Sequence, residues 1–140
     1  MTGKEYFEGI GVKVVALDRL LEKINELREE ATSLGGFAYD EPIVQGGSSH
    51  NHYEGAIDTL ADLERQYVLD KAAIEEEIKQ AYSALETLSK REYYKVLDLR
   101  YLRKKRHNWG WIAEEMGYSE DWVRHLCGEA LSEFERLYLK

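Results

Sequence analysis

The sequence predicts an all-α protein: a long antiparallel helical hairpin, similar to a coiled coil, followed by a C-terminal helix-turn-helix. Two heptad series of apolar residues predict the hairpin, and a helix–glycine–helix pattern near the C-terminus predicts the second part. We place the domain boundary at residue 88, so that residues 1–88 form the hairpin and residues 89–140 form the helix-turn-helix domain. The helices are expected near residues 3–34, 56–88, 89–102, 109–116 and 120–137.

The first helix is expected to begin at a capping box. Thr2 and Glu5 have the required spacing, in which a hydroxyl and a carboxylate satisfy the first free amides of a helix. Apolar residues then recur every three or four positions, with Arg28 as the one polar interruption: Phe7, Ile10, Val14, Leu17, Leu21, Ile24 and Ala31. Gly35-Gly36 is expected to end this helix.

A glycine-rich loop is predicted over residues 35–55, which contain the only proline and two Gly-Gly pairs. His50 and His52 lie in this loop with the spacing His-x-His. The pair could supply half of a metal site, but no nearby cysteine or second histidine pair completes one. A solvated loop is therefore expected here, and no metal or other cofactor.

The second long helix repeats the heptad spacing. Its apolar positions, interrupted by Glu64 and Lys71, are Leu60, Tyr67, Ile74, Ile78, Ala81, Leu85 and Leu88. Helices of about 30 residues are roughly 45 Å long, and these apolar stripes are too narrow for either helix to be stable alone. We therefore expect the two long helices to pack against each other as an antiparallel hairpin. Further leucines widen the stripes and suit either a second copy of the chain, giving a homodimer, or the C-terminal domain: Leu20, Leu27, Leu63 and Leu69.

The net charge of −8 is unevenly distributed along the chain. Residues 1–88 carry 8 Lys and Arg against 18 Asp and Glu, a net of −10, whereas residues 89–140 carry 11 against 9, a net of +2. A basic run near the start of the second part contains Arg100, Arg103, Lys104, Lys105 and Arg106. This asymmetry predicts two modules with different roles, although a solvated helix end would also carry such a run.

The helix-turn-helix is predicted from matched local signals between Trp109 and Gly128. Ser89 and Glu92 form a second capping box, which opens the helix before it. Asn108 and Ser119 are suited to be N-caps, and Gly117 can adopt the positive φ of a sharp turn. Ala113 is small where the next helix crosses. A small core is expected from Ile112, Met116, Tyr118, Val123 and Leu126.

Three stretches of this region resemble region 4 of sigma-70-type RNA polymerase sigma factors. They are EYYKVLDLRY over 92–101, WIAEEMGYS over 111–119, and Val-Arg-x-Leu over 123–126 followed by ALSEF over 130–134. The whole chain is similar to small phage and prophage proteins with a Lys-Glu-Tyr helix, two long charged helices and a sigma-like helix-turn-helix, akin to the ArpU and RinA late-gene regulators. The resemblance implies a DNA-binding transcription regulator that acts at promoters with RNA polymerase.

The recognition helix departs from the sigma pattern. Region 4 typically has a basic then an acidic residue at the start, with Arg and Gln one turn on. Here these positions hold Glu120, Asp121, Arg124 and His125. Arg124 is expected to address a guanine edge, and Asp121 either accepts from cytosine or favours the helix terminus. Trp122 contacts either a base or a neighbouring side chain.

The expected DNA-binding set combines this helix with the basic run before it. Lys104, Lys105 and Arg106 would contact phosphates, which position a protein on a duplex without reading its sequence. The full set is Lys104, Lys105, Arg106, Asn108, Ser119, Glu120, Asp121, Trp122, Arg124 and His125. Because the charge balance makes it a weak binder alone, dimerisation or RNA polymerase should supply local concentration.

Two other functions fit the sequence. A phage terminase small subunit also joins a helix-turn-helix to a helical oligomerisation region. A protein-interaction module with a degenerate helix-turn-helix, binding RNA polymerase or acting like an anti-sigma factor, fits the surface acidity. An enzyme is not expected, because no phosphate loop, metal spacing or nucleophile with a base is evident. The single cysteine, Cys127, suits a reducing compartment, and without a signal peptide or membrane span we expect a cytoplasmic protein.

Overall fold

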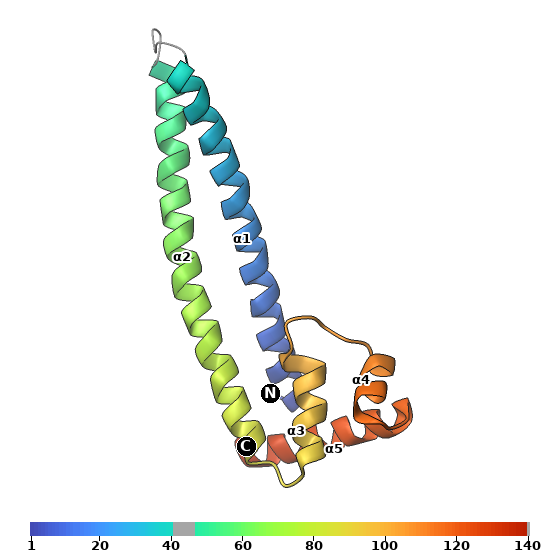
Figure 1. Cartoon of the computed structure of the whole chain (residues 1–140). Helices are drawn as coiled ribbons and strands as arrows, with labels where there is room; N and C mark the ends of the chain where they lie inside the picture. Colours follow the sequence, from blue (N-terminus) through green and yellow to red (C-terminus); the bar gives the residue numbers. More distant parts are fainter. Residues whose placement is uncertain (41–46, 140) are drawn as a thin grey trace. The chain divides into compact units, whose positions relative to one another are not determined.

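The computed structural model describes the backbone of residues 1–40 and 47–139, and their side chains except those of 33–40 and 47–54. Every regular element in the described residues is a helix, which confirms the all-α prediction (Figure 1). The elements are α1 Gly3–Asp40, α2 Gly47–Glu86, α3 Arg91–Leu97, a π-helical turn η1 Asp98–Leu102, α4 Trp109–Met116 and α5 Glu120–Tyr138. None of the described helices is long and apolar enough to cross a membrane.

Helices α1 and α2 extend further than predicted at the ends that face the glycine-rich segment. Gly35-Gly36 does not end α1, which continues to Asp40, and α2 begins at Gly47. The predicted loop over 35–55 was therefore too long. An internal glycine disfavours a helix by only about 1 kcal/mol relative to alanine, so a long helix can continue through it. The side chains of His50 and His52 lie outside the described residues.

The start of α1 is as predicted, whereas the start of α3 is not. The Glu5 amide donates to Thr2 Oγ1 at 3.1 Å, so Thr2 caps α1. At α3 the N-cap is Lys90, which makes no side-chain capping bond. The predicted capping box of Ser89 and Glu92 is absent because Ser89 has another partner. Its Oγ lies 3.1 Å from Glu133 Oε2 on α5, and its amide also donates to that carboxylate.

The described chain divides into two compact units. Unit 1 comprises residues 1–14 and 74–140, and unit 2 comprises residues 15–73. The predicted boundary at residue 88 falls inside unit 1. The start of α1 and the end of α2 belong to unit 1 because their apolar residues share one hydrophobic cluster with α3, α4 and α5. The members from residues 1–88 are Phe7, Ile10, Ala81, Leu85 and Leu88.

In each unit, α1 is joined to α2 by an ion pair. In unit 1, Lys13 Nζ lies 2.6 Å from Glu77 Oε1. In unit 2, Arg28 Nε lies 3.3 Å from Glu64 Oε1, so the polar interruptions of the two heptad series meet each other. Of the extra leucines, Leu69 is 71% exposed, whereas Leu20, Leu27 and Leu63 are half-buried.

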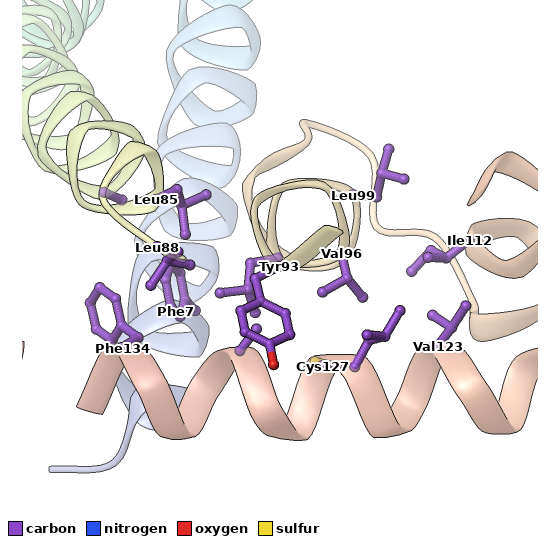
Figure 2. Packing of buried hydrophobic residues seen from close by; sticks show 14 of the residues in the cluster. Phe7, Leu85, Leu88, Tyr93, Val96, Leu99, Ile112, Val123, Cys127 and Phe134 are labelled. Atoms are coloured by element: carbon purple, nitrogen blue, oxygen red, sulfur yellow. The ribbon is translucent and has the colours of Figure 1, made fainter. Parts of the chain in front are cut away.

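The core of unit 1 connects the start of α1 to the C-terminal half of α5. Figure 2 shows Phe134, Cys127 and Val123 pointing from α5 into the cluster. The Phe7 ring centroid lies 4.8 Å from that of Phe134 and 5.5 Å from that of Tyr101. Burial raises the pKa of the Cys127 thiol to about 11, which makes this cysteine an apolar filler and not a reactive thiol.

The first turn of α1 contacts α5 directly. The Gly3 amide donates to Glu135 Oε1 at 2.6 Å, so a carboxylate of α5 satisfies one of the free amides of α1. A Cβ at Gly3 would lie 3.1 Å from the Leu131 carbonyl oxygen, which explains why glycine occupies this position. Residues at the two ends of the chain are therefore part of one core.

The shared core makes a prediction for Phe7→Ala. Removing this fully buried ring should lower the free energy of unfolding by about 3–5 kcal/mol. Urea denaturation followed by the fluorescence of Trp109, Trp111 and Trp122 measures the change. Val12→Ala, at a site that is 68% exposed on the same helix, should shift the transition by less than about 0.5 kcal/mol. A tryptophan transition that is unchanged in Phe7→Ala would show that α4 and α5 fold without α1.

Candidate nucleic-acid interface

The turn between α4 and α5 is fixed by its own backbone. Gly117 has φ +74°, its amide donates to the Ala113 oxygen at 2.9 Å, and the Tyr118 amide donates to the same oxygen at 3.1 Å. With a further bond from Gly117 to Glu114, this is a Schellman motif, in which a left-handed glycine satisfies the last carbonyls of a helix. The prediction for Gly117 is confirmed.

Both helices of this pair are capped by the residues that the sequence predicted. Asn108 Oδ1 accepts from the Trp111 amide at 2.8 Å at the start of α4. Ser119 Oγ accepts from the Trp122 amide at 3.2 Å at the start of α5. A side-chain cap of this kind is worth about 1 kcal/mol to a helix. The first turn of α5 is thereby held in place, and its exposed side chains are displayed from a defined backbone.

Four of the five predicted core residues of this pair lie as expected. Ile112 and Val123 are buried in the hydrophobic cluster (Figure 2). Leu126 is buried in the same cluster, and Met116 packs against it. Tyr118 does not belong to the core: it is 39% exposed, and its hydroxyl donates to Glu92 Oε1 at 2.9 Å. The phenol instead ties the turn to α3, because its polar tip finds a carboxylate at the surface.

Arg124 lies on the exposed face of α5, one turn after the cap. Its side chain is 57% exposed, and its Nη2 lies 3.8 Å from Glu120 Oε1. Its guanidinium carbon lies 5.8 Å from the centre of the Trp109 ring at the start of α4. A Cβ at Gly110 would lie 4.0 Å from the Glu120 carboxylate, so the starts of α4 and α5 are close together. Asn108, Glu120 and Arg124 therefore belong to one patch of surface.

Two members of the basic run, Arg100 and Arg103, bind partners within the chain, and three have no such partner among the described residues. Arg103 Nη2 lies 3.2 Å from the buried Asp98 Oδ2, and Arg100 Nη1 donates to the His107 oxygen at 2.9 Å. Arg100 also lies 4.2 Å from the centre of the Trp109 ring. Lys104, Lys105 and Arg106 are exposed, and no hydrogen bond or ion pair within the described residues engages them.

The loop that carries these three cations, residues 103–108, is held at both ends. At its start, Asp98 accepts from the Tyr82 hydroxyl at 2.5 Å and pairs with Arg103. Burial, with this hydrogen bond as the second cause, raises the pKa of Tyr82 well above its usual range. At its end, the His107 ring stacks on Trp111 with centroids 3.5 Å apart. Anchored ends limit the entropy that the loop would lose on meeting a ligand.

His125 and Trp122, also near the start of α5, lie next to each other, and His125 contacts the Glu129 carboxylate. His125 Nε2 lies 2.6 Å from Glu129 Oε1, and the Tyr93 hydroxyl donates to Glu129 Oε2 at 2.6 Å. The Tyr93 bond, helped by His125, lowers the pKa of Glu129, while the same bond and burial raise the pKa of Tyr93 to about 12. Trp122 is 46% exposed, with its ring 5.2 Å from that of His125.

A shallow groove of about 760 Å³ runs along α5 beside this network. It is lined by Ser89 and Tyr93 together with residues from the exposed face of α5: Arg124, His125, Gly128, Glu129, Ser132, Glu133 and Arg136. Tyr93, Glu129 and this groove were not predicted from the sequence, because their contacts join residues 36 or more positions apart. Among the described residues, no group of acids, histidines and cysteines could hold a metal ion.

Acidic side chains share the surface of α4 and α5 with the basic ones. Glu114 and Glu115 are exposed on α4, and Glu120 and Asp121 are exposed in the first turn of α5. The latter two stabilise the helix through its N-terminal dipole, by about 0.3–1 kcal/mol each. The same carboxylates would repel a phosphate, whereas the exposed cations Lys104, Lys105, Arg106 and Arg124 would attract one.

The Glu129 network predicts a pH dependence of stability. Because the folded-state pKa of Glu129 lies below its ordinary value of 4.5, its ionised form stabilises the fold above that pH and the effect is lost as the pH falls through the lowered value. Glu129→Gln should be less stable than the wild type at pH 7, with a difference that shrinks in acid. Urea denaturation at a series of pH values measures it. In a Tyr93→Phe background the difference should be smaller; an equal difference in both backgrounds would contradict the assignment.

The chain matches no model of a protein family, no curated protein and no solved structure. Its function is therefore inferred from the residues of unit 1. Three features matter most: the capped turn between α4 and α5, the exposed Arg124, and the anchored loop with its three exposed cations.

Proposed function

We propose that this protein is a DNA-binding transcription regulator. In this proposal α3, α4 and α5 form a helix-turn-helix similar to region 4 of sigma factors, joined to an antiparallel hairpin of α1 and α2. The observation that carries it is the position of Arg124: exposed, one turn beyond a capped helix start, and next to the start of α4. Recognition helices of this class contact base edges with side chains near their N-terminus.

Arg124 is available for a base despite its ion pair. An exposed pair of residues four apart on a helix is worth about 0.3–0.5 kcal/mol, and a separation of 3.8 Å is at the long end for such a pair. A bidentate contact from arginine to guanine is worth about 1–3 kcal/mol of discrimination. The contact with DNA is the stronger of the two, so Glu120 would orient Arg124 without withholding it.

Lys104, Lys105 and Arg106 supply the contact with the phosphate backbone in this proposal. Each exposed cation that neutralises a phosphate adds about 0.9 to the dependence of log K on log salt. Three such contacts give weak binding, and the acidic residues 1–88 weaken it further. RNA polymerase is the proposed source of local concentration, and a second copy of the chain bound through the long helices would serve the same purpose. A protein of this kind would act in the cytoplasm and is proposed to be encoded by a phage or prophage.

A protein-interaction module is the second candidate, and a specific observation favours it. Glu114, Glu115, Glu120 and Asp121 are all exposed around the turn. A basic surface of RNA polymerase would suit these carboxylates better than a duplex would. The two candidates differ in whether Arg124 contributes to DNA binding.

Arg124→Ala should relax sequence specificity by roughly ten- to a hundredfold, because one bidentate base contact is lost. The measurement is a binding titration on promoter fragments from the protein's own locus and on an unrelated duplex, with and without RNA polymerase. Arg19→Ala, at an exposed arginine of α1, is the matched control and should leave the specificity ratio unchanged. Specific binding that survives Arg124→Ala, in a protein that still holds polymerase, would favour the interaction module.

Lys105→Ala should act differently, because a phosphate contact carries no sequence information. The affinity for the promoter fragment and for the unrelated duplex should fall by the same factor. The slope of log K against log salt should become shallower by about one unit. Titrations at several salt concentrations measure the slope, and a slope equal to that of the wild type would remove Lys105 from the interface.

A further inference from the structure

Tyr93, Glu129 and His125 form a chain of polar contacts that ends on the exposed face of α5. Figure 2 shows the Tyr93 hydroxyl directed toward α5, where it donates to Glu129 Oε2 at 2.6 Å. The other carboxylate oxygen, Oε1, lies 2.6 Å from His125 Nε2. Tyr93 is buried, whereas the side chain of Glu129 is 38% exposed and that of His125 is 56% exposed. A buried phenol therefore holds the carboxylate, and the carboxylate holds the imidazole.

The partner of Nε2 determines which nitrogen of the His125 ring carries the proton. An ionised carboxylate can only accept hydrogen bonds, and the lowered pKa of Glu129 keeps this carboxylate ionised at neutral pH. His125 Nε2 therefore carries a proton, and in the neutral ring Nδ1 is left as an acceptor. Within the described part of the chain, Nδ1 has no hydrogen-bond partner. It is free to accept from a group outside the chain.

His125 belongs to the surface that is proposed to face DNA. It directly follows Arg124, and both residues line the shallow groove along α5. The Trp122 ring centroid lies 5.2 Å from that of His125, so an indole limits the imidazole on another side. A side chain restricted by a carboxylate and by an aromatic ring loses little conformational entropy when it meets a ligand.

The charges around His125 favour a base edge over a phosphate as that ligand. Glu129 and Glu133 line the same groove, and their carboxylates would repel a phosphate. A base edge carries no net charge. Adenine N6 and cytosine N4 are the donors that bases present in the major groove, whereas guanine and thymine present the acceptors O6, N7 and O4. An acceptor such as Nδ1 matches the first two bases and opposes the other two.

We propose that His125 is a specificity-determining residue whose Nδ1 accepts a hydrogen bond from the amino group of an adenine or a cytosine, and that Glu129 and Tyr93 position it. This inference rests on the proposed function and adds a second base contact beside that of Arg124. It also gives Glu129 a role on a DNA-binding helix: the carboxylate fixes the ring nitrogen that reads the base.

The positioning is tested without DNA, by the ¹⁵N shifts of the histidine rings in labelled protein at a pH where the rings are neutral. The His125 signals are identified by their loss in His125→Ala, and they should show the proton on Nε2. In Glu129→Gln the ratio of the Nε2–H form to the Nδ1–H form should fall by about two- to tenfold, because an amide can donate as well as accept. Tyr93→Phe should lower the ratio less. Tyr118→Phe, which removes a different phenol–carboxylate bond, is the matched control and should leave it unchanged.

The base contact is tested by selecting duplexes from a randomised pool, with and without RNA polymerase. The wild type should show one position at which adenine or cytosine is preferred over guanine and thymine by about two- to tenfold, the size of one hydrogen bond. His125→Ala should lose this preference and keep the guanine that is assigned to Arg124, and Arg124→Ala should do the reverse. Arg19→Ala should select the same bases as the wild type.

The outcomes separate this inference from the proposed function. If the wild type selects no duplex, with or without RNA polymerase, the proposed function fails and the base contact of His125 fails with it. If the wild type selects duplexes and His125→Ala selects the same bases at every position, only this inference is overturned. A ring that carries its proton on Nδ1, or a ratio that Glu129→Gln leaves unchanged, would overturn the positioning by Glu129 whatever the protein binds.

Discussion

The contact between the first two turns of α1 and the C-terminal half of α5 is the constraint on which unit 1 depends. Phe7 packs between Phe134 and Tyr101, and the Glu135 carboxylate accepts from the Gly3 amide. These contacts hold the C-terminal half of α5 in the core, while Glu120, Asp121, Trp122 and Arg124 on the outer side of its first turns remain exposed. A helix anchored in this way can present its N-terminal residues to a ligand with little loss of conformational entropy.

The charged side chains of the basic run in unit 1 have two roles: some hold the loop in place and others are exposed. Arg100 and Arg103 hold the loop before α4, through the His107 carbonyl and the Asp98 carboxylate. Lys104, Lys105 and Arg106 are left exposed by the same arrangement. The buried Asp98 is tolerated because both of its oxygens have partners, the Tyr82 hydroxyl and the Arg103 guanidinium. Arg100 and Arg103 thus hold in place the loop that carries the three exposed cations before α4.

Local signals in the sequence were sufficient for much of the fold and for part of the site. Thr2, Asn108, Gly117 and Ser119 were identified correctly because each acts on backbone groups within five residues. Ser89 was misassigned because its partner is 44 residues away, and Tyr118 because Glu92 is 26 residues away. The inclusion of the α1 start and the α2 end in unit 1 also depends on distant contacts. Patterns in the sequence show which face of a helix is apolar, and they do not show which element covers it.

The ion pair between Arg28 and Glu64 has a consequence for how α1 and α2 align in unit 2. Apolar heptads repeat, so sliding one helix past the other by seven residues, about 10.5 Å, would again bring apolar side chains together. Such a shift in one direction would place Arg28 near Lys71, and in the other near Ile57, where its charge would have no carboxylate opposite. The two polar interruptions, whose side chains are about half-exposed, therefore favour the observed register over a shift of seven residues in either direction.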